Sequence, residues 1–231
     1  MSALSITWYG HASFLLTTPG GRRIVFDPWL TNPKAPAGAR IDKADVICVP
    51  HGHSDHTTDV VPIARATGAP VVAIFELATY FQGKGLKDTI GMNMGGTVDV
   101  KGLKITMTSA VHSSGVVEDG QSIYLGEPAG YVVRLEDGRA LYFAGDTALF
   151  GDMRLIRELH APEIAFLPIG DHFTMGPTAA AKAVELLGVR QVVPMHYGTF
   201  PALTGTPEEL KKLVEPRGVD VLVLQPGETA Q

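Results

Sequence analysis

The stretch from His51 to His56 concentrates side chains that bind metal ions. It reads His-Gly-His-Ser-Asp-His, so three imidazoles and one carboxylate fall within six residues, directly after the apolar stretch Val46–Val49. Imidazole suits zinc, iron and nickel, and a carboxylate adds a harder ligand that suits manganese. In an extended turn, side chains two positions apart point the same way, so His51 and His53 can hold one ion. Asp55 and His56 are then free to turn toward a second ion.

Three later side chains of the same chemical types each follow a stretch with the pattern of a strand. His112 follows Lys104–Ser109, Asp146 follows Leu141–Ala144, and His196 follows Val192–Pro194. Sheet proteins place their sites at strand ends, which favours one shared site. Taken alone, Asp146 would more often cap a helix, and either histidine could belong to the core. The hypothesis of a metal site therefore depends on the whole set.

In this order, the ligand-type residues resemble the metallo-β-lactamase superfamily: His-x-His-x-Asp-His, a lone histidine, Gly-Asp-Thr and a late histidine. More narrowly, the chain resembles the metal-dependent hydrolases related to L-ascorbate-6-phosphate lactonase and to N-acylphosphatidylethanolamine phospholipase D. The resemblance covers nearly the whole chain. It includes the motifs Trp8–Phe14, Asp27–Trp29, Ala144–Thr147, Pro168–Pro177 and Met195–Pro201.

Position by position, this resemblance implies a site for two divalent metal ions. His51, His53 and His112 would bind the first ion, Asp55, His56 and His196 would bind the second, and Asp146 would bridge them. Zinc is the expected metal, with manganese, nickel and iron as alternatives. The resemblance also implies an α/β fold. This is a four-layer αββα sandwich of two mixed sheets with helices outside and the site at one edge of the two sheets.

The pattern of apolar residues, considered without that resemblance, predicts strands first and an alternation of helices and strands later. The predicted strands are Ile6–Tyr9, Ser13–Thr17, Arg23–Phe26, Val46–Val49, Val71–Ile74, Thr97–Val100, Lys104–Ser109, Gly130–Leu135, Ala140–Ala144, Ile164–Leu167, Gln191–Pro194 and Val219–Leu224. The predicted helices are Asp59–Ala66, Glu76–Gln82, Met153–Leu159, Thr178–Leu187 and Pro207–Val214. This order favours two sheets covered by helices. Without an internal repeat, linker or low-complexity segment, residues 1–231 are interpreted as a single domain.

The expected chemistry is hydrolysis. Two divalent ions about 3.5–4 Å apart lower the pKa of a bridging water and provide hydroxide at physiological pH. The hydroxide would attack a carbonyl carbon or a phosphorus atom, while a metal stabilises the charge on the substrate oxygen. Asp55 is the candidate that both ligates and orients this nucleophile.

Two further histidines are candidates for catalysis. His11 would contact the substrate or donate a proton, and a structural histidine is the alternative. His172 follows the strand Ile164–Leu167 and would donate a proton to the leaving group, and a surface loop is the alternative. Asp27 either fixes a ligand imidazole or forms the turn before Pro28.

The composition indicates a globular protein, with 45% hydrophobic and 19% charged residues and a formal net charge of -5. The single cysteine, Cys48, lies in an apolar stretch and is interpreted as a buried thiol. The stretch Met1–Ser5 lacks the basic region and long apolar run of a signal peptide, and no apolar run approaches membrane-spanning length. We therefore expect a cytoplasmic enzyme. Its oligomeric state is open, with a homo-oligomer allowed.

Three functions are compatible with this ligand set. The first is hydrolysis of a small molecule, either an ester or lactone or a phosphodiester. The second is a nuclease, which is disfavoured because the sequence has neither a basic patch nor a long insertion. The third is a sulfur dioxygenase with a single iron, which metal analysis and an oxygen-consumption assay would separate from a hydrolase with two metal ions.

Overall fold

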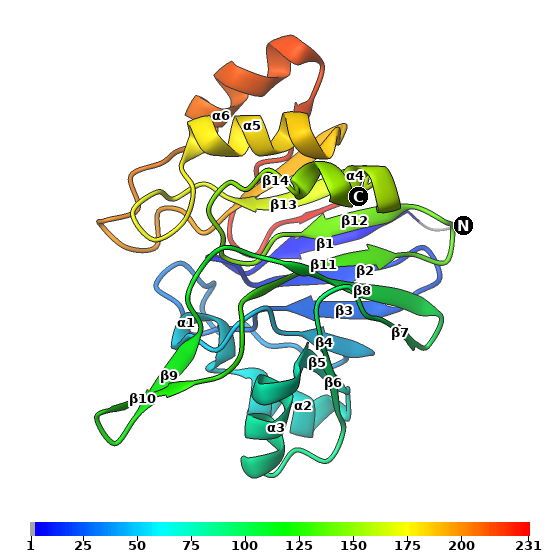
Figure 1. Ribbon diagram of the computed structural model, residues 1–231, viewed down its shortest axis with the longest axis vertical. Helices are drawn as coiled ribbons and strands as arrows, with labels where there is room; N and C mark the ends of the chain where they lie inside the picture. The colour runs from blue at the N-terminus through cyan, green and yellow to red at the C-terminus, as the bar shows by residue number, and fades with distance from the viewer. Residues whose placement is uncertain (1–2) are drawn as a thin grey trace.

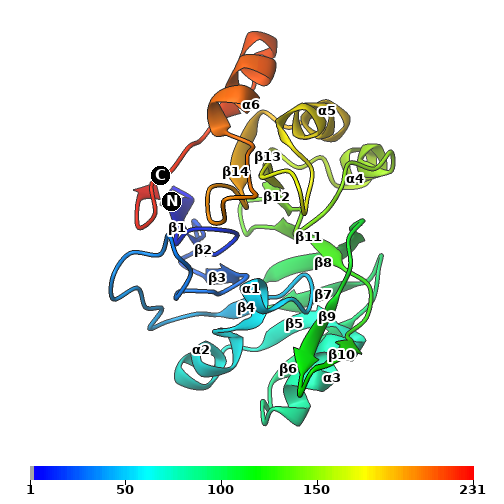
Figure 2. The ribbon, with the colours of Figure 1, turned by 90° about the vertical axis from the view of Figure 1, so that its left-hand side faces the viewer.

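The computed structural model describes residues 3–231. They form four layers in which two β-sheets face each other and helices cover the outer faces (Figures 1 and 2). The αββα sandwich that the resemblance implied is therefore confirmed. Met1 and Ser2, part of the stretch considered for a signal peptide, lie outside the described residues. The interpretation of residues 1–231 as one domain stays a prediction.

The first sheet is built mainly from the N-terminal part of the chain. Within residues 3–231 it has seven strands, in the order β16 (Thr229–Ala230), β1 (Ser5–Trp8), β2 (Phe14–Thr17), β3 (Arg23–Phe26), β4 (Val46–Cys48), β5 (Val71–Ile74) and β6 (Thr89–Met92). Strands β1 to β3 are antiparallel neighbours, whereas β3 to β6 run parallel. All residues of β4 and β5 are buried, as is typical of parallel strands that are covered on both faces.

The second sheet brings several strand ends to one edge. Its order among the described residues is β15 (Asp220–Val221), β14 (Gln191–Met195), β13 (Ile164–Pro168), β12 (Ala140–Phe143), β11 (Ala129–Arg134), β8 (Leu103–Ser109) and β7 (Thr97–Val100). Strands β12 to β15 run parallel. Because β11 is antiparallel to both β12 and β8, β8 runs in the same direction as β12. The carboxyl ends of β8, β12 and β14 therefore meet at the same edge.

The longer helices cover the outer faces of the two sheets (Figures 1 and 2). Helices α2 (Val60–Thr67) and α3 (Phe75–Gly83) lie outside the first sheet, and α4 (Met153–His160), α5 (Pro177–Leu187) and α6 (Pro207–Val214) lie outside the second. A short 3-10 helix, Glu215–Arg217, follows α6. Both α5 and α6 begin with a proline in the first turn, where no amide hydrogen is needed. Between residues 3 and 231, no helix is long and apolar enough to cross a membrane.

Aromatic side chains pack between the two sheets. Phe26 of the first sheet stacks on Phe143 of the second with ring centroids 4.2 Å apart, and Phe14 meets the edge of Phe166 at 5.0 Å. All four are fully buried, and burial of one such side chain stabilises the fold by roughly 1.5–3 kcal/mol. Tyr131 of β11 adds polar contacts, because its hydroxyl donates to the carbonyls of residues 49 and 72. This core holds the strand ends of both sheets in fixed positions.

The structure differs from the sequence-based expectation in two places near the site. Residues Ser54–Thr57 form one helical turn, α1, where an extended turn was expected, because the amide of His56 donates to the carbonyl of His53. Strands β9 (Gly115–Glu118) and β10 (Gln121–Tyr124) form a projecting hairpin that was not predicted (Figure 1). The expected strand Val219–Leu224 is reduced to the two residues of β15, and β6 and β16 were not predicted.

Candidate metal centre

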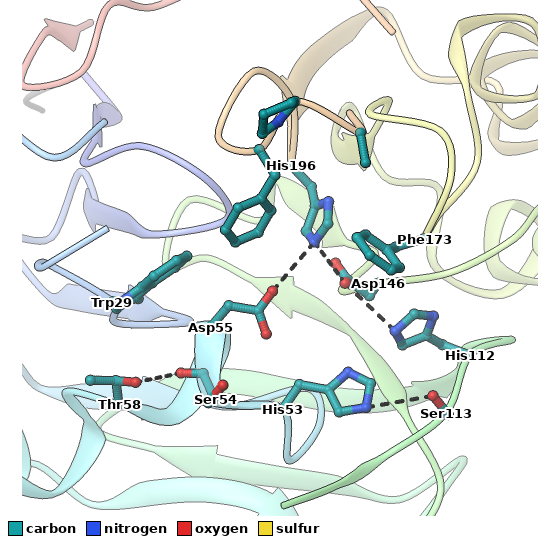
Figure 3. A pocket seen from close by; sticks show the side chains of 13 residues that line it. Trp29, His53, Ser54, Asp55, Thr58, His112, Ser113, Asp146, Phe173 and His196 are labelled. Atoms are coloured by element: carbon teal, nitrogen blue, oxygen red, sulfur yellow. Dashed lines mark hydrogen bonds and ion pairs between the residues drawn. The ribbon is translucent and has the colours of Figure 1, made fainter. Parts of the chain in front are cut away.

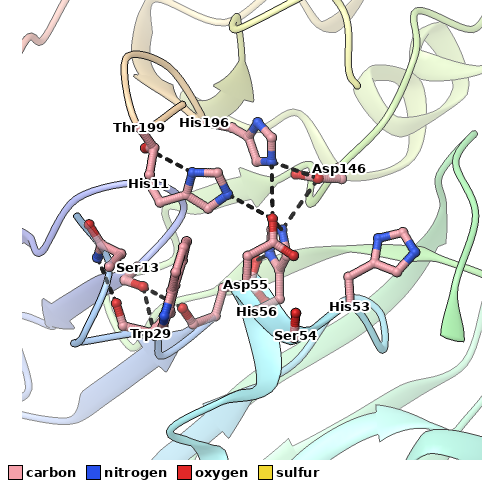
Figure 4. A network of polar contacts seen from close by, with 12 residues as sticks. His11, Ser13, Trp29, His53, Ser54, Asp55, His56, Asp146, His196 and Thr199 are labelled. Carbon is pink, nitrogen blue, oxygen red and sulfur yellow. Dashed lines mark hydrogen bonds and ion pairs between the residues drawn. The ribbon is translucent and has the colours of Figure 1, made fainter. Parts of the chain in front are cut away.

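The seven predicted ligands lie together at the edge where β4, β8, β12 and β14 end, and Figures 3 and 4 label all of them except His51. They form overlapping groups whose ligand atoms lie within 4.8 Å of one another, and the members are His51, His53, Asp55, His56, His112, Asp146 and His196. His11 joins one of these groups. Six of the eight histidines in the sequence are therefore gathered here, and His160 and His172 are not.

The first group consists of His51, His53 and His112. The Nε2 atom of His51 lies 3.0 Å from the Nδ1 atom of His53. His51 and His53 come from the loop after β4, and His112 follows β8 of the other sheet. Burial lowers the pKa of all three imidazoles, and that of His51 lies well below its usual value. They are therefore neutral, which is the form that binds a metal ion.

The second group contains Asp55, His56 and His196. The Asp55 Oδ2 atom lies 3.7 Å from His56 Nε2 and 3.8 Å from His196 Nε2. Burial by itself lowers the pKa of His196, but the Asp146 carboxylate outweighs it and raises the pKa to about 9. The same balance, with several carboxylates opposing burial, raises the pKa of His56 well above its usual value. This position therefore favours a positive charge, which a bound cation can supply in place of protons.

Asp146 lies between the two groups (Figure 4). Its Oδ2 atom is 2.9 Å from His196 Nε2 and 3.3 Å from His56 Nε2, and it is 3.7 Å from His112 Nε2 and 4.0 Å from His51 Nε2. Burial raises the pKa of Asp146, but the charges of His196 and His56 outweigh it and lower the pKa well below its usual value. One ionised oxygen is thus within reach of both groups.

Several buried polar atoms of the candidate ligands lack hydrogen-bond partners, which shows whether these residues fit metal ions. Within the described residues, His51 Nδ1, Asp146 Oδ1 and His196 Nδ1 are buried without a hydrogen-bond partner. His56 Nε2 and His196 Nε2 are also buried, and although each lies close to Asp146 Oδ2, neither makes a well-directed hydrogen bond. A buried polar atom without a partner costs free energy, and such atoms rarely gather by chance. His56 Nε2 and His196 Nε2 belong to the ligand groups, so a cation between them would satisfy both. The donor set therefore fits divalent metal ions.

Asp27 holds one of the candidate ligands in place. Its Oδ2 atom lies 2.8 Å from His56 Nδ1, and both side chains are fully buried. This contact occupies Nδ1 and leaves Nε2 of His56 facing Asp146. Burial raises the pKa of Asp27 to about 6. Of the two roles considered from the sequence, the structure places Asp27 as the partner of an imidazole, an arrangement common beside metal ligands.

His11 contacts Asp55 from the turn between β1 and β2. Its Nε2 atom lies 3.1 Å from Asp55 Oδ2, and its Nδ1 atom lies 3.0 Å from the Thr199 hydroxyl. Burial lowers the pKa of His11 to about 4, so the ring is neutral. The side chain is fully buried and does not line the pocket described below. Its position suits orientation of Asp55 better than direct contact with a substrate.

Strained backbone accompanies these side chains. His11, Asp27 and His196 all have φ between 43° and 55°, in the left-handed region. Such conformations cost about 1–3 kcal/mol each and persist where the surrounding structure imposes them. Gly170 allows the close approach next to His196, because a Cβ atom at residue 170 would lie 2.1 Å from the His196 carbonyl oxygen. No pattern in the sequence predicts these positive φ values.

A pocket of about 910 Å³ opens onto the centre (Figure 3). Its lining residues are Trp29, His53, Ser54, Asp55, Thr58, His112, Ser113, Asp146, Phe173, His196, Phe200, Pro201 and Ala202. His172, a candidate proton donor in the sequence analysis, is exposed and is not among them, whereas its neighbour Phe173 is. The sequence analysis did not single out Trp29, Phe173 or Phe200, although all three lie within motifs that carry the family resemblance.

The sequence also matches a known protein family. Residues 22–197 match the family model described as the beta-lactamase superfamily domain. The chain belongs to the β-lactamase superfamily. The matched residues include all seven candidate ligands, so the superfamily domain contains both groups described above.

Several proteins are similar to this chain over almost their full lengths. A protein of Rubrobacter xylanophilus named UPF0173 metal-dependent hydrolase is 53% identical, over 96% of this chain and 94% of that protein. A protein of the same name from Solibacter usitatus is 49% identical, over 99% of this chain and 100% of its own length. A solved metallo hydrolase from Ignicoccus hospitalis is 39% identical to this chain, with a TM-score of 0.88. The match covers 98% of this chain and 97% of the Ignicoccus hospitalis chain.

Proposed function

We propose that this protein is a metal-dependent hydrolase that binds two divalent cations and cleaves a small ester, lactone or phosphodiester. The observation that carries the proposal is the position of Asp146 Oδ2, which lies within 4.0 Å of ring nitrogens from both histidine groups. The names of the similar proteins from Rubrobacter xylanophilus and Solibacter usitatus support the same reaction class.

The proposed ligands divide between the two cations. His51, His53 and His112 would hold one cation, Asp55, His56 and His196 would hold the other, and Asp146 would contact both. Zinc is the expected metal because nitrogen ligands predominate. Divalent cations held here would lower the pKa of a water molecule toward neutrality and stabilise negative charge on a substrate oxygen.

The residue proposed to orient the attacking water is Asp55. Burial raises its pKa, but His56 and the hydrogen bond from His11 outweigh burial, so the pKa lies below its usual range and the carboxylate is ionised. It lines the pocket, with a side chain that is 25% exposed. An ionised carboxylate there accepts a hydrogen bond from water, whose oxygen then adds to the carbonyl carbon or phosphorus. The bond to the leaving oxygen breaks, and that oxygen takes up a proton.

The pocket lining disfavours the nuclease alternative. None of its residues, all of which belong to the described part of the chain, is a lysine or arginine. Nucleic-acid binding depends on several such cations along the phosphate backbone. A small substrate fits this pocket better than a polynucleotide does.

Metal content and turnover test the proposal together. The protein is stripped with a chelator and titrated with zinc or manganese in a calorimeter, and we expect two equivalents per chain. The reconstituted protein is then assayed with lactones, phosphodiesters and thioesters. A single iron with oxygen consumption would instead support the sulfur dioxygenase alternative.

Two substitutions sharpen this test. His53→Ala and Asp55→Ala should abolish turnover and lower the metal content while leaving the circular dichroism spectrum unchanged. His160→Ala is the matched control, because His160 ends α4 outside the ligand groups. Undiminished turnover in either of the first two variants would contradict the proposed mechanism.

A further inference from the structure

Aromatic side chains flank the metal-ligand groups on two sides. Trp29 and Phe200 form one side of the pocket, with ring centroids 5.9 Å apart. The buried His11 ring meets both of them edge to face, at 5.3 Å and 5.6 Å. Phe173 lies on the other side of the contact between Asp55 and His196 (Figure 3). A molecule whose reacting bond reaches Asp55 therefore lies between aromatic surfaces.

Phe173 is held in an exposed position by an unusual turn. Its side chain is 53% exposed, although an exposed aromatic ring forgoes the stabilisation that burial provides. The two preceding residues, Asp171 and His172, have φ values of 63° and 58°. The Phe173 amide donates to the Asp171 carbonyl at 2.6 Å, which closes the turn. Strained residues of this kind cluster at ligand-binding sites, and this turn places an apolar ring at the pocket.

The polar groups of the pocket can contact the reacting bond of a substrate. None of them could pair with a negatively charged substituent elsewhere on that substrate. Its ionisable lining residues are His53, Asp55, His112, Asp146 and His196, all of which belong to the ligand groups. The other polar side chains are the hydroxyls of Ser54, Thr58 and Ser113. A carboxylate or phosphate on the substrate, away from the reacting bond, would find no cationic side chain of this pocket to pair with.

We propose that the substrate is an uncharged ester or lactone that carries an aliphatic or aromatic substituent, held between Phe173 and the pair Trp29 and Phe200. This inference rests on the proposed function and narrows it, because it favours an uncharged ester or lactone over substrates that carry a charged group away from the reacting bond, such as polyanionic sugars. Water adds to the carbonyl carbon, the bond to the alkoxy oxygen breaks, and that oxygen takes the proton, which gives a hydroxy acid from a lactone or an acid and an alcohol from an ester.

Three γ-lactones test the proposal with the zinc-reconstituted protein. The probes are γ-butyrolactone, γ-decalactone with its six-carbon chain, and 5-oxotetrahydrofuran-2-carboxylate. Since burial of each methylene group favours binding, even partial burial of the chain should make kcat/KM for γ-decalactone about tenfold higher than for γ-butyrolactone. The carboxylate-bearing lactone should be the poorest of the three. Equal values, or a preference for the carboxylate, would overturn the inference while leaving the hydrolase proposal intact.

A matched pair of phenylalanine variants connects this preference to the pocket. Phe173→Ala should lower the ratio of the two kcat/KM values, decalactone over butyrolactone, by about threefold or more. Phe75→Ala is the control, because Phe75 is 61% exposed on α3 and lies outside the pocket. A ratio that Phe173→Ala leaves unchanged would contradict the proposal.

Binding provides a readout that does not depend on turnover. The sequence has two tryptophans; Trp8 is buried and Trp29 lines the pocket. Titration with 5-hexylpyrrolidin-2-one, the lactam analogue of γ-decalactone, should change the tryptophan emission saturably. The change should be lost in Trp29→Phe. If no lactone is cleaved but this signal is present, the proposed reaction fails and the apolar site stands. If the signal is absent, the apolar site fails whatever the turnover.

Discussion

His11 lies against Asp55, with His11 Nε2 3.1 Å from Asp55 Oδ2, although 44 positions separate them in the sequence (Figure 4). The same imidazole contacts the Thr199 hydroxyl through Nδ1. A buried ring from the N-terminal turn thus joins the histidine-rich loop to the loop after β14. Because Asp55 lines the pocket and His11 does not, we propose that His11 acts through Asp55 as a positioning residue.

Replacing His11 should impair Asp55 without unfolding the protein. His11→Asn removes the ring but accepts the positive φ at this position, since asparagine tolerates that region. We expect kcat or metal affinity to fall by about 10–100-fold, as for other residues that support ligands. Steady-state kinetics and metal titration measure the two effects. His160→Asn, the control, should change neither kcat nor metal affinity. Normal kcat with normal metal affinity in His11→Asn would exclude a positioning role for His11.

Asp27 should control the affinity of the second ligand group. Asp27→Asn keeps the size of the side chain but replaces the carboxylate that lies 2.8 Å from His56 Nδ1. We expect metal affinity at that group to fall by about 10–100-fold, measured by calorimetric titration. Asp152→Asn, at an exposed carboxylate before α4, is the control and should bind metal normally. An unchanged affinity in Asp27→Asn would show that the contact is dispensable.

Any larger residue at Gly170 should destabilise the protein. A Cβ atom there would lie 2.1 Å from the His196 carbonyl oxygen, so the backbone that presents His196 must move. We expect Gly170→Ala to lower the free energy of unfolding by about 1–3 kcal/mol and to reduce turnover. Gly83→Ala has open space around the new methyl group and should not destabilise the protein. Urea unfolding of both variants is the measurement, and equal stabilities would refute the steric reason.

A pH-dependent contribution to stability is expected from Asp45. Its burial opposes ionisation, but Lys101 and the amide of Arg23 outweigh that effect and lower the pKa of Asp45. A carboxyl group whose pKa is lower in the folded state stabilises the protein above its unfolded pKa and loses that effect as pH falls. Asp45→Asn should therefore cost up to about 1 kcal/mol at neutral pH. In urea unfolding the difference should shrink toward about pH 3; a constant difference would contradict this.

The regular elements could largely be predicted from the sequence. The expected bounds of β3, β5, β7 and α6 are those of the structure. The strands β3 and β5 are short, mainly apolar runs, and α6 begins with a capping box between Thr206 and Glu209. The site could be anticipated because its candidate ligands follow predicted strands, and strand ends gather at the edge of a sheet.

Other features could not be predicted because they depend on tertiary contacts. The helical turn α1 is too short to produce a periodic pattern. The pairing of Asp27 with His56 was one of two alternatives, and only the packing of β3 beside β4 decides it. Phe173 was not predicted because its neighbour His172 carries an imidazole, which is a more obvious candidate for catalysis than a phenyl ring. The β9–β10 hairpin was missed although Asp119-Gly120, both with positive φ, is the type of turn that joins two strands.

The origin of the ligands has a mechanical consequence. Each ligand group takes two side chains from the segment after β4, which comprises a loop and α1, and one from the end of a strand in the opposite sheet, His112 or His196. A cation in either group would therefore fasten one sheet to the other, as a cross-link does. Because a ligand that binds only the folded state raises its stability, the melting temperature should rise with metal concentration. Metal ions that bind as proposed would therefore also hold the two sheets of the sandwich together.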